Sequence, residues 1–127
     1  MNLDKRIKIR NLDVLTPAGE KFRLRWKEYQ ILSLLVARSP ELVTRTEIIE
    51  NIWKGTYCSD STINQTIKSI RQKISDSEHT LIRTIPRLGY KVENQAAFHF
   101  ISEDEDYADD DILNGNDDID VDIQAEL

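Results

Sequence analysis

The spacing of hydrophobic residues changes along the 127-residue chain. Apolar and polar residues alternate over residues 5–10 and 20–24, the period of half-buried strands. Residues 16–19, Thr-Pro-Ala-Gly, have the composition of a turn, and residues 12–15 are expected to add a short strand before it. The first quarter of the chain therefore predicts an antiparallel sheet.

Two helices are predicted next. The apolar residues between positions 26 and 38 form a broad stripe at helical spacing, which predicts a heavily buried helix ended by the Ser39-Pro40 pair. Residues 44–47, Thr-Arg-Thr-Glu, match a capping box. A second helix is therefore expected to begin near Arg45 and to end around Gly55.

A third helix is predicted over residues 61–74, where the apolar residues are reduced to one narrow seam. Two strands, residues 81–85 and 90–92, follow and are joined by Pro-Arg-Leu-Gly, so they predict a hairpin with a basic tip. Together the elements predict the α+β fold of a winged helix-turn-helix: an N-terminal antiparallel sheet, three helices and a C-terminal β-hairpin wing. The residues of the seam are Ile63, Ile67, Ile70 and Ile74.

The formal net charge of −6 conceals two oppositely charged parts. The chain has 17 Lys and Arg, all within residues 5–91, against 11 Asp and Glu through residue 95 and 12 beyond it, so the two parts carry +6 and −12. We therefore expect a domain over residues 1–95 and an acidic, largely disordered tail over residues 96–127. This asymmetry is typical of a polyanion-binding module joined to an acidic arm.

The third helix has a polar outer face opposite its isoleucine seam. Asn and Gln can pair with adenine in the major groove of DNA, and Lys can pair with guanine. The alternative is an ordinary solvated helix face. Nucleic-acid binding is favoured because no acid lies between Thr62 and Ser75 and because a basic hairpin follows. The residues of this face are Ser61, Gln65, Lys68 and Gln72, flanked by Asn64 and Ser69.

Three stretches carry a family resemblance: LRWKEYQILSLLVARSPELVTRTEIIENIWKG, STINQTIKSIRQKI and IRTIPRLGYKV. In this order and spacing they resemble the DNA-binding domain of OmpR/PhoB-type transcription regulators over most of residues 24–92. The I-P-R-L-G-Y ending is closer to the ToxR-like and CadC-like branch of that family. That branch typically joins the domain to a membrane span, whereas this sequence is expected to contain neither a span nor a phosphorylatable receiver domain.

The resemblance implies roles for individual residues. Base reading falls on Asn64, Gln65, Lys68 and Ser69. Backbone contacts fall on Ser61, Thr62 and Arg71 of the helix, beside Gln72, and on Thr84 and Tyr90 of the hairpin, with Arg87 entering the minor groove at its tip. Lys54, Thr56 and Tyr57 lie in the loop that corresponds to the family's contact with RNA polymerase.

We therefore expect a sequence-specific, double-stranded DNA-binding transcription regulator in a bacterial cytoplasm, with RNA polymerase as a further partner and self-association on tandem sites. The alternative is a winged-helix protein-interaction module whose acidic tail mimics DNA or docks a partner. In either case the tail could fold back on the basic domain and compete with DNA. No enzyme motif, metal spacing or cofactor signature is present, and Trp26 and Trp53 are expected to anchor the core.

Overall fold

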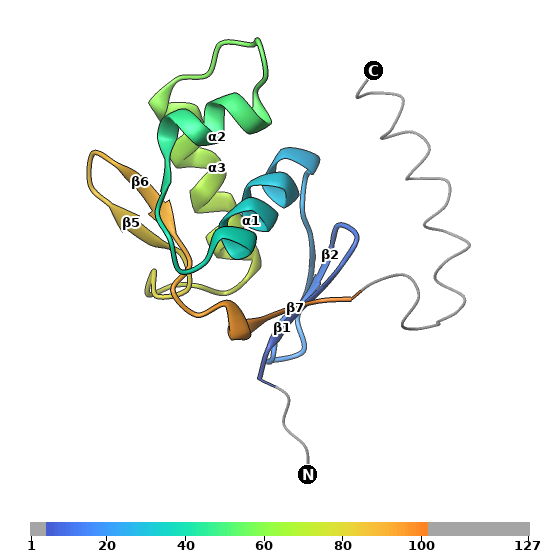
Figure 1. Ribbon diagram of the computed structural model, residues 1–127. Coiled ribbons are helices and arrows are strands. Elements are labelled where there is room, and N and C mark those ends of the chain that lie inside the picture. The colour runs from blue at the N-terminus through green and yellow to red at the C-terminus, as the bar shows by residue number, and fades with distance from the viewer. Residues whose placement is uncertain (1–4, 102–127) are drawn as a thin grey trace.

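A computed structural model describes residues 5–101 of the chain. Within that range three helices stand between an N-terminal sheet and a C-terminal hairpin, as the hydrophobic pattern predicts (Figure 1). The acidic segment 102–127 lies outside the described residues. In chain order the elements are β1 (Ile7–Arg10), β2 (Asp13–Leu15), β3 (Lys21–Arg23), α1 (Trp26–Arg38), β4 (Val43–Thr44), α2 (Arg45–Ile52), α3 (Asp60–Lys73), β5 (Arg83–Ile85), β6 (Gly89–Lys91), the short helix η1 (Gln95–Ala97) and β7 (Phe98–Phe100).

The first sheet has four strands in the order β3-β2-β1-β7. Strands β1, β2 and β3 are antiparallel, as expected, but β7 returns from the far end of the domain and pairs with β1 in parallel, with Ile7 opposite Phe98. Phe98, which lies beyond the expected boundary at residue 95, is buried in the common core. Strand β7 was not among the predicted strands, because a parallel partner this distant in sequence leaves no local signal.

The wing sheet has three strands in the order β4-β6-β5. Strand β4 contains only two residues and was not predicted from the sequence. Gly89 allows β6 to approach it, because a Cβ atom at this position would lie 2.1 Å from the carbonyl oxygen of Val43. The hairpin is thereby held against the start of α2, where the amide of Arg45 donates a 3.1 Å hydrogen bond to the carbonyl of Leu88.

The three helices pack around a common core to which both sheets contribute. The isoleucine seam of α3 is buried against this core, with exposed fractions of 0% for Ile63 and Ile70 and 1% for Ile67 and Ile74. Trp53, just after α2, is a core residue as expected, but Trp26 is 36% exposed because it begins α1 and stacks on Tyr29 at the surface. In Figure 1 the wing and the four-stranded sheet lie on opposite sides of α1.

Candidate nucleic-acid interface

The outer face of α3 is exposed along its full length, as its spacing predicts. The side chains of Gln65, Lys68 and Gln72 point away from the buried seam and, within residues 5–101, form no hydrogen bond or ion pair. The helix begins with a capped first turn, in which the Ser59 hydroxyl accepts a 3.1 Å hydrogen bond from the amide of Thr62. Ser61 and Thr62 are exposed beside this N-terminus, where the positive end of the helix dipole favours an anion.

Asn64 is exposed but has a fixed orientation. The hydroxyl of Tyr90, on β6 of the wing, donates a 2.6 Å hydrogen bond to its Oδ1 atom. Tyr90 itself is 2% exposed, and burial raises the pKa of its phenol, so that it stays protonated and able to donate. Tyr90 thus lies beneath the outer face of α3 and engages Oδ1 of the exposed Asn64, which leaves the Nδ2 donors of this amide for another partner.

Ser69 lies at the margin of the outer face, as its spacing predicts, and its side chain is turned toward α1. Its hydroxyl donates a 2.6 Å hydrogen bond to Glu28 on α1, and Lys73 donates a 2.8 Å hydrogen bond to the same carboxylate. Residue 69 lies between the outer face and the seam, so a buried acceptor on α1 draws the serine inward. Burial by itself raises the pKa of Glu28, but the hydrogen bonds from Lys73, Ser69 and the Arg25 amide outweigh it and lower the pKa below its ordinary value.

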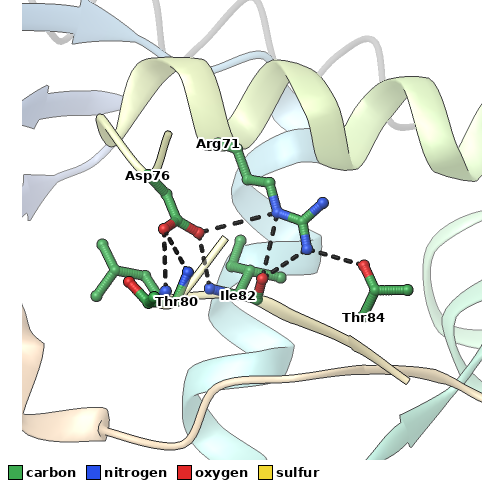
Figure 2. A network of polar contacts seen from close by, with 6 residues as sticks. Arg71, Asp76, Thr80, Ile82 and Thr84 are labelled. Atoms are coloured by element: carbon green, nitrogen blue, oxygen red, sulfur yellow. Dashed lines mark hydrogen bonds and ion pairs between the residues drawn. The ribbon is translucent and has the colours of Figure 1, made fainter. Parts of the chain in front are cut away.

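Arg71 joins α3 to the first strand of the wing (Figure 2). Its Nη2 atom donates to the carbonyl of Ile82 at 2.6 Å and to the Thr84 hydroxyl at 2.9 Å, and its Nε atom donates to the same carbonyl at 3.2 Å. The side chain is 11% exposed. The family resemblance implies backbone contacts for Arg71 and Thr84. In the structure these two side chains bond to each other, and a contact of either with DNA stays a prediction.

Asp76 holds the other side of this junction and is almost completely buried. Its carboxylate accepts hydrogen bonds from the amides of Thr80, Leu81 and Ile82 at 2.8, 3.0 and 2.9 Å, and lies 3.8 Å from Nε of Arg71 (Figure 2). Hydrogen bonds to an ionised acceptor are about twice as strong as neutral ones. The turn between α3 and β5 is therefore fixed, and with it the position of the wing relative to α3.

Arg87 lies at the exposed tip of the wing. The amide of Leu88 donates a 3.0 Å hydrogen bond to the carbonyl of Ile85, closing a four-residue turn. Arg87 is its third residue and has a φ angle of 71°, a left-handed conformation that favours glycine. A strained arginine at an exposed tip is the kind of outlier that points to a function rather than to stability.

Most other cations near this surface are matched by acids. Arg83 and Lys91 both lie within 3.5 Å of Glu93, and Arg45 lies 3.4 Å from Asp60 at the start of α3. Among the described residues of α3 and the hairpin, Lys68 and Arg87 are the cations without such a partner. The surface therefore holds its available positive charge at two points, the middle of α3 and the wing tip.

The loop between α2 and α3 projects from the end of the domain at which α3 begins. Lys54, Thr56 and Tyr57 are exposed, and Tyr57 is 87% exposed, the most of any large hydrophobic residue described. Gly55 turns the chain with a φ angle of 69°. A tyrosine presented to solvent in this way suits a contact with another protein.

Sequence reasoning missed the residues that assemble this surface. Glu28 and Asp76 are buried acids, and charge counting treats acids as part of a solvated exterior. Arg45 was assigned to a capping pattern only, but it also lies 5.9 Å from the ring centre of Tyr90. A usable signal was the position of Glu28 three residues into α1, where its carboxylate accepts a 2.8 Å hydrogen bond from the Arg25 amide, the Glu half of a capping box.

Two further properties concern the described residues alone. None of their helices combines the length and the apolar character needed to cross a membrane. Their His, Cys, Asp and Glu side chains form no group of three or more that could hold a metal ion.

Three helices preceded by a sheet and followed by a β-hairpin wing define a winged-helix domain. The family described as "Transcriptional regulatory protein, C terminal" matches residues 19–92, and the chain belongs to this family of OmpR/PhoB-type DNA-binding domains. The heme response regulator HssR of Staphylococcus aureus is 44% identical over 70 residues, which are 54% of this chain and 31% of HssR. The chain therefore spans about a third of the length of the curated relatives it matches.

Solved structures agree with this assignment. The DNA-binding domain of CadC from E. coli is 25% identical, covers 64% of this chain and 85% of its own, and superposes with a TM-score of 0.53. The DNA-binding domain of the response regulator AdeR, solved in complex with an intercistronic region, covers 71% of this chain and 96% of its own at 20% identity and a TM-score of 0.57, a likeness of fold. Family and fold are those of DNA-binding transcription regulator domains and not of enzymes.

Proposed function

We propose that the chain regulates transcription by binding a specific sequence of double-stranded DNA, with α3 in the major groove and the β5-β6 hairpin on the adjacent backbone. The observation that carries this proposal is the outer face of α3. Gln65, Lys68 and Gln72 are exposed in one row and have no partner among the described residues, and Asn64 beside them is held outward by Tyr90. Amide and ammonium groups in this arrangement match base edges in the major groove.

The remaining contacts divide by position. Ser61 and Thr62, at the N-terminus of α3, are placed to meet a phosphate, and Arg87 is placed to enter the minor groove or to meet the backbone beside it. Ser69, Arg71 and Tyr90 act within the domain as positioning residues, because their polar groups are already engaged by Glu28, Ile82 and Asn64. In this proposal few cations bind phosphate, and direct readout contributes a large share of the affinity.

The loop with Tyr57 at its centre is proposed to contact RNA polymerase. Its support is the exposure of Tyr57 and of Lys54 and Thr56 beside it, at the end of the domain where α3 begins. Bound in this orientation, the domain presents a protein-binding loop next to the DNA.

Selection of bound sites from random duplex DNA tests the proposed function. The full chain is expected to enrich one short motif, and a direct repeat of that motif would show that two copies bind together. A Gln65→Ala variant is expected to relax the motif at one position, while Gln30→Ala on α1 leaves it unchanged. Enrichment of no motif by the full chain would contradict sequence-specific binding and favour the protein-interaction module.

A further inference from the structure

The positive charge of the domain is concentrated away from α3. Residues 5–27 contain eight Lys and Arg against two acids, a net charge of +6, whereas residues 28–95 contain nine against eight, a net charge of +1. The first of these segments forms strands β1 to β3, the residues that flank them and the first two residues of α1. The four-stranded sheet, and not the DNA-reading helix, therefore has the strongest attraction for a polyanion.

The two faces of this sheet differ sharply. The register places Ile7, Ile9 and Phe98 on the face that packs on the core, where they are buried. The side chains that alternate with them lie on the outer face. This outer face carries four cations and one histidine against a single acid: Lys8, Arg10, Lys21, Arg23 and His99, with Asp13.

Strand β7 ends this sheet on one side, and within residues 5–101 no strand pairs with its second edge. An unpaired edge of this kind is a template for a further strand. Beside it, on the core side, runs a row of partly exposed rings, in which Phe100 meets Tyr29 edge-on at 6.3 Å and Tyr29 stacks on Trp26 at 5.7 Å. The edge of β7 therefore has apolar side chains on the core side of the sheet and basic side chains on its outer side.

The sequence that follows β7 has a matching pattern. Residues 118–123 read Asp-Ile-Asp-Val-Asp-Ile, a strict alternation with the period of a β-strand. In a strand its three apolar side chains point to one face and its three carboxylates to the other. Residues 102–117 separate this segment from Ile101, and 16 residues span up to roughly 50 Å when extended, enough to return along β7.

We propose that residues 118–123 add a fifth strand to the sheet at the edge of β7. Ile119, Val121 and Ile123 continue the core face beside Phe98 and Phe100, while Asp118, Asp120 and Asp122 continue the basic outer face beside His99 and Lys8. The short tether keeps the segment at a high effective concentration near the edge, so a weak strand contact is sufficient. The tail is thereby held on the sheet and away from α3.

Nuclear magnetic resonance on the full chain tests this proposal at low salt. Cys58→Ser with Gln124→Cys provides one attachment point for a spin label. We expect the label to broaden the amide signals of β7 and β1 and to leave those of α3 unaffected, and the amides of residues 119–123 to exchange at least about tenfold more slowly than in an unstructured chain. Broadening centred on α3, or unprotected tail amides, would overturn the proposal.

A matched control separates strand addition from simple charge attraction. Asp120→Val combined with Val121→Asp preserves composition and charge but breaks the alternation, and it is expected to abolish the slow exchange. Equal protection in this variant would overturn the proposed strand register. A mixture of spin-labelled and isotope-labelled chains is expected to show no broadening, since broadening there would place the tail on a second copy instead.

Discussion

The hydroxyl of Tyr90, in the wing, donates a 2.6 Å hydrogen bond to Oδ1 of Asn64, on the exposed face of α3. The bond crosses from a buried residue to an exposed one, so the wing fixes the orientation of an amide that faces solvent. A side-chain amide that rotates freely can present either its NH₂ donor or its oxygen acceptor to a base. An amide held in one orientation presents the same group each time. In the proposed complex with DNA, the wing would contribute to readout through this bond without touching the base.

Tyr90→Phe removes the hydroxyl and keeps the ring. We expect the free energy of unfolding to fall by about 1 kcal/mol, the usual net value of one hydrogen bond. Discrimination at one base position should weaken by a similar amount, measured as the ratio of dissociation constants for the selected duplex and a singly substituted one. Asn64→Ala is the reference variant. If Asn64→Ala weakens discrimination at one base position and Tyr90→Phe does not, Tyr90 has no influence on readout by Asn64.

Asp76→Ala leaves three amides at the start of the wing without their acceptor. Loss of a buried charged acceptor typically lowers the free energy of unfolding by about 3 to 5 kcal/mol. Urea denaturation of the full chain measures this change. Ser77→Ala, at the exposed neighbouring position, should stay within about 0.5 kcal/mol. A loss of less than about 1 kcal/mol for Asp76→Ala would contradict the role assigned to its carboxylate.

The buried carboxylate of Glu28 makes stability depend on pH. Its pKa in the folded chain lies below the ordinary value of 4.5, so the unfolded chain binds the proton more readily. The stabilisation is therefore complete above about pH 4.5 and is lost as pH falls through the lowered pKa. Urea unfolding between about pH 6 and pH 3 should show this decline, and Glu28→Gln should reduce its slope. An equal slope in both proteins would contradict the assignment.

Arg87→Gly separates the function of the wing tip from its stability. Glycine adopts the positive φ angle of this position without strain, so the free energy of unfolding should not decrease. Affinity for DNA should fall roughly tenfold at low salt, because a charge-assisted contact is lost. Arg83→Ala is the matched control, since this arginine already faces Glu93 and should change affinity little. Equal losses for both variants would contradict a distinct role for the tip.

Hydrophobic periodicity was sufficient to predict the helices and the hairpin. The isoleucine seam of α3 and the capping box at Thr44 are local patterns, and local patterns survive in the sequence. Strands β4 and β7 have two and three residues, and each is stabilised by a partner far along the chain. Length alone does not explain this, because β2, β3, β5 and β6 also have three residues. A turn and an adjacent strand mark those four in the sequence, whereas β4 and β7 have no such neighbour.

The candidate site was predicted less completely than the fold. The outward positions of Gln65, Lys68 and Gln72 follow from helix geometry. Ser69 and Arg71 lie at the margins of that face, where the choice between solvent and the domain depends on the neighbouring element. Ser69 turns toward Glu28, and Arg71 turns toward the carbonyl of Ile82. Spacing along the sequence does not predict where these two partners lie relative to α3.

The central claim, that the outer face of α3 reads bases, is tested most directly at Gln65. The measurement is the affinity of the full chain and of Gln65→Ala for the selected duplex and for a duplex of random sequence, at one salt concentration. The account predicts a loss of about 1 to 3 kcal/mol in binding free energy on the selected duplex and almost none on the random one. Equal losses on both duplexes, or no loss on either, would contradict base readout by α3.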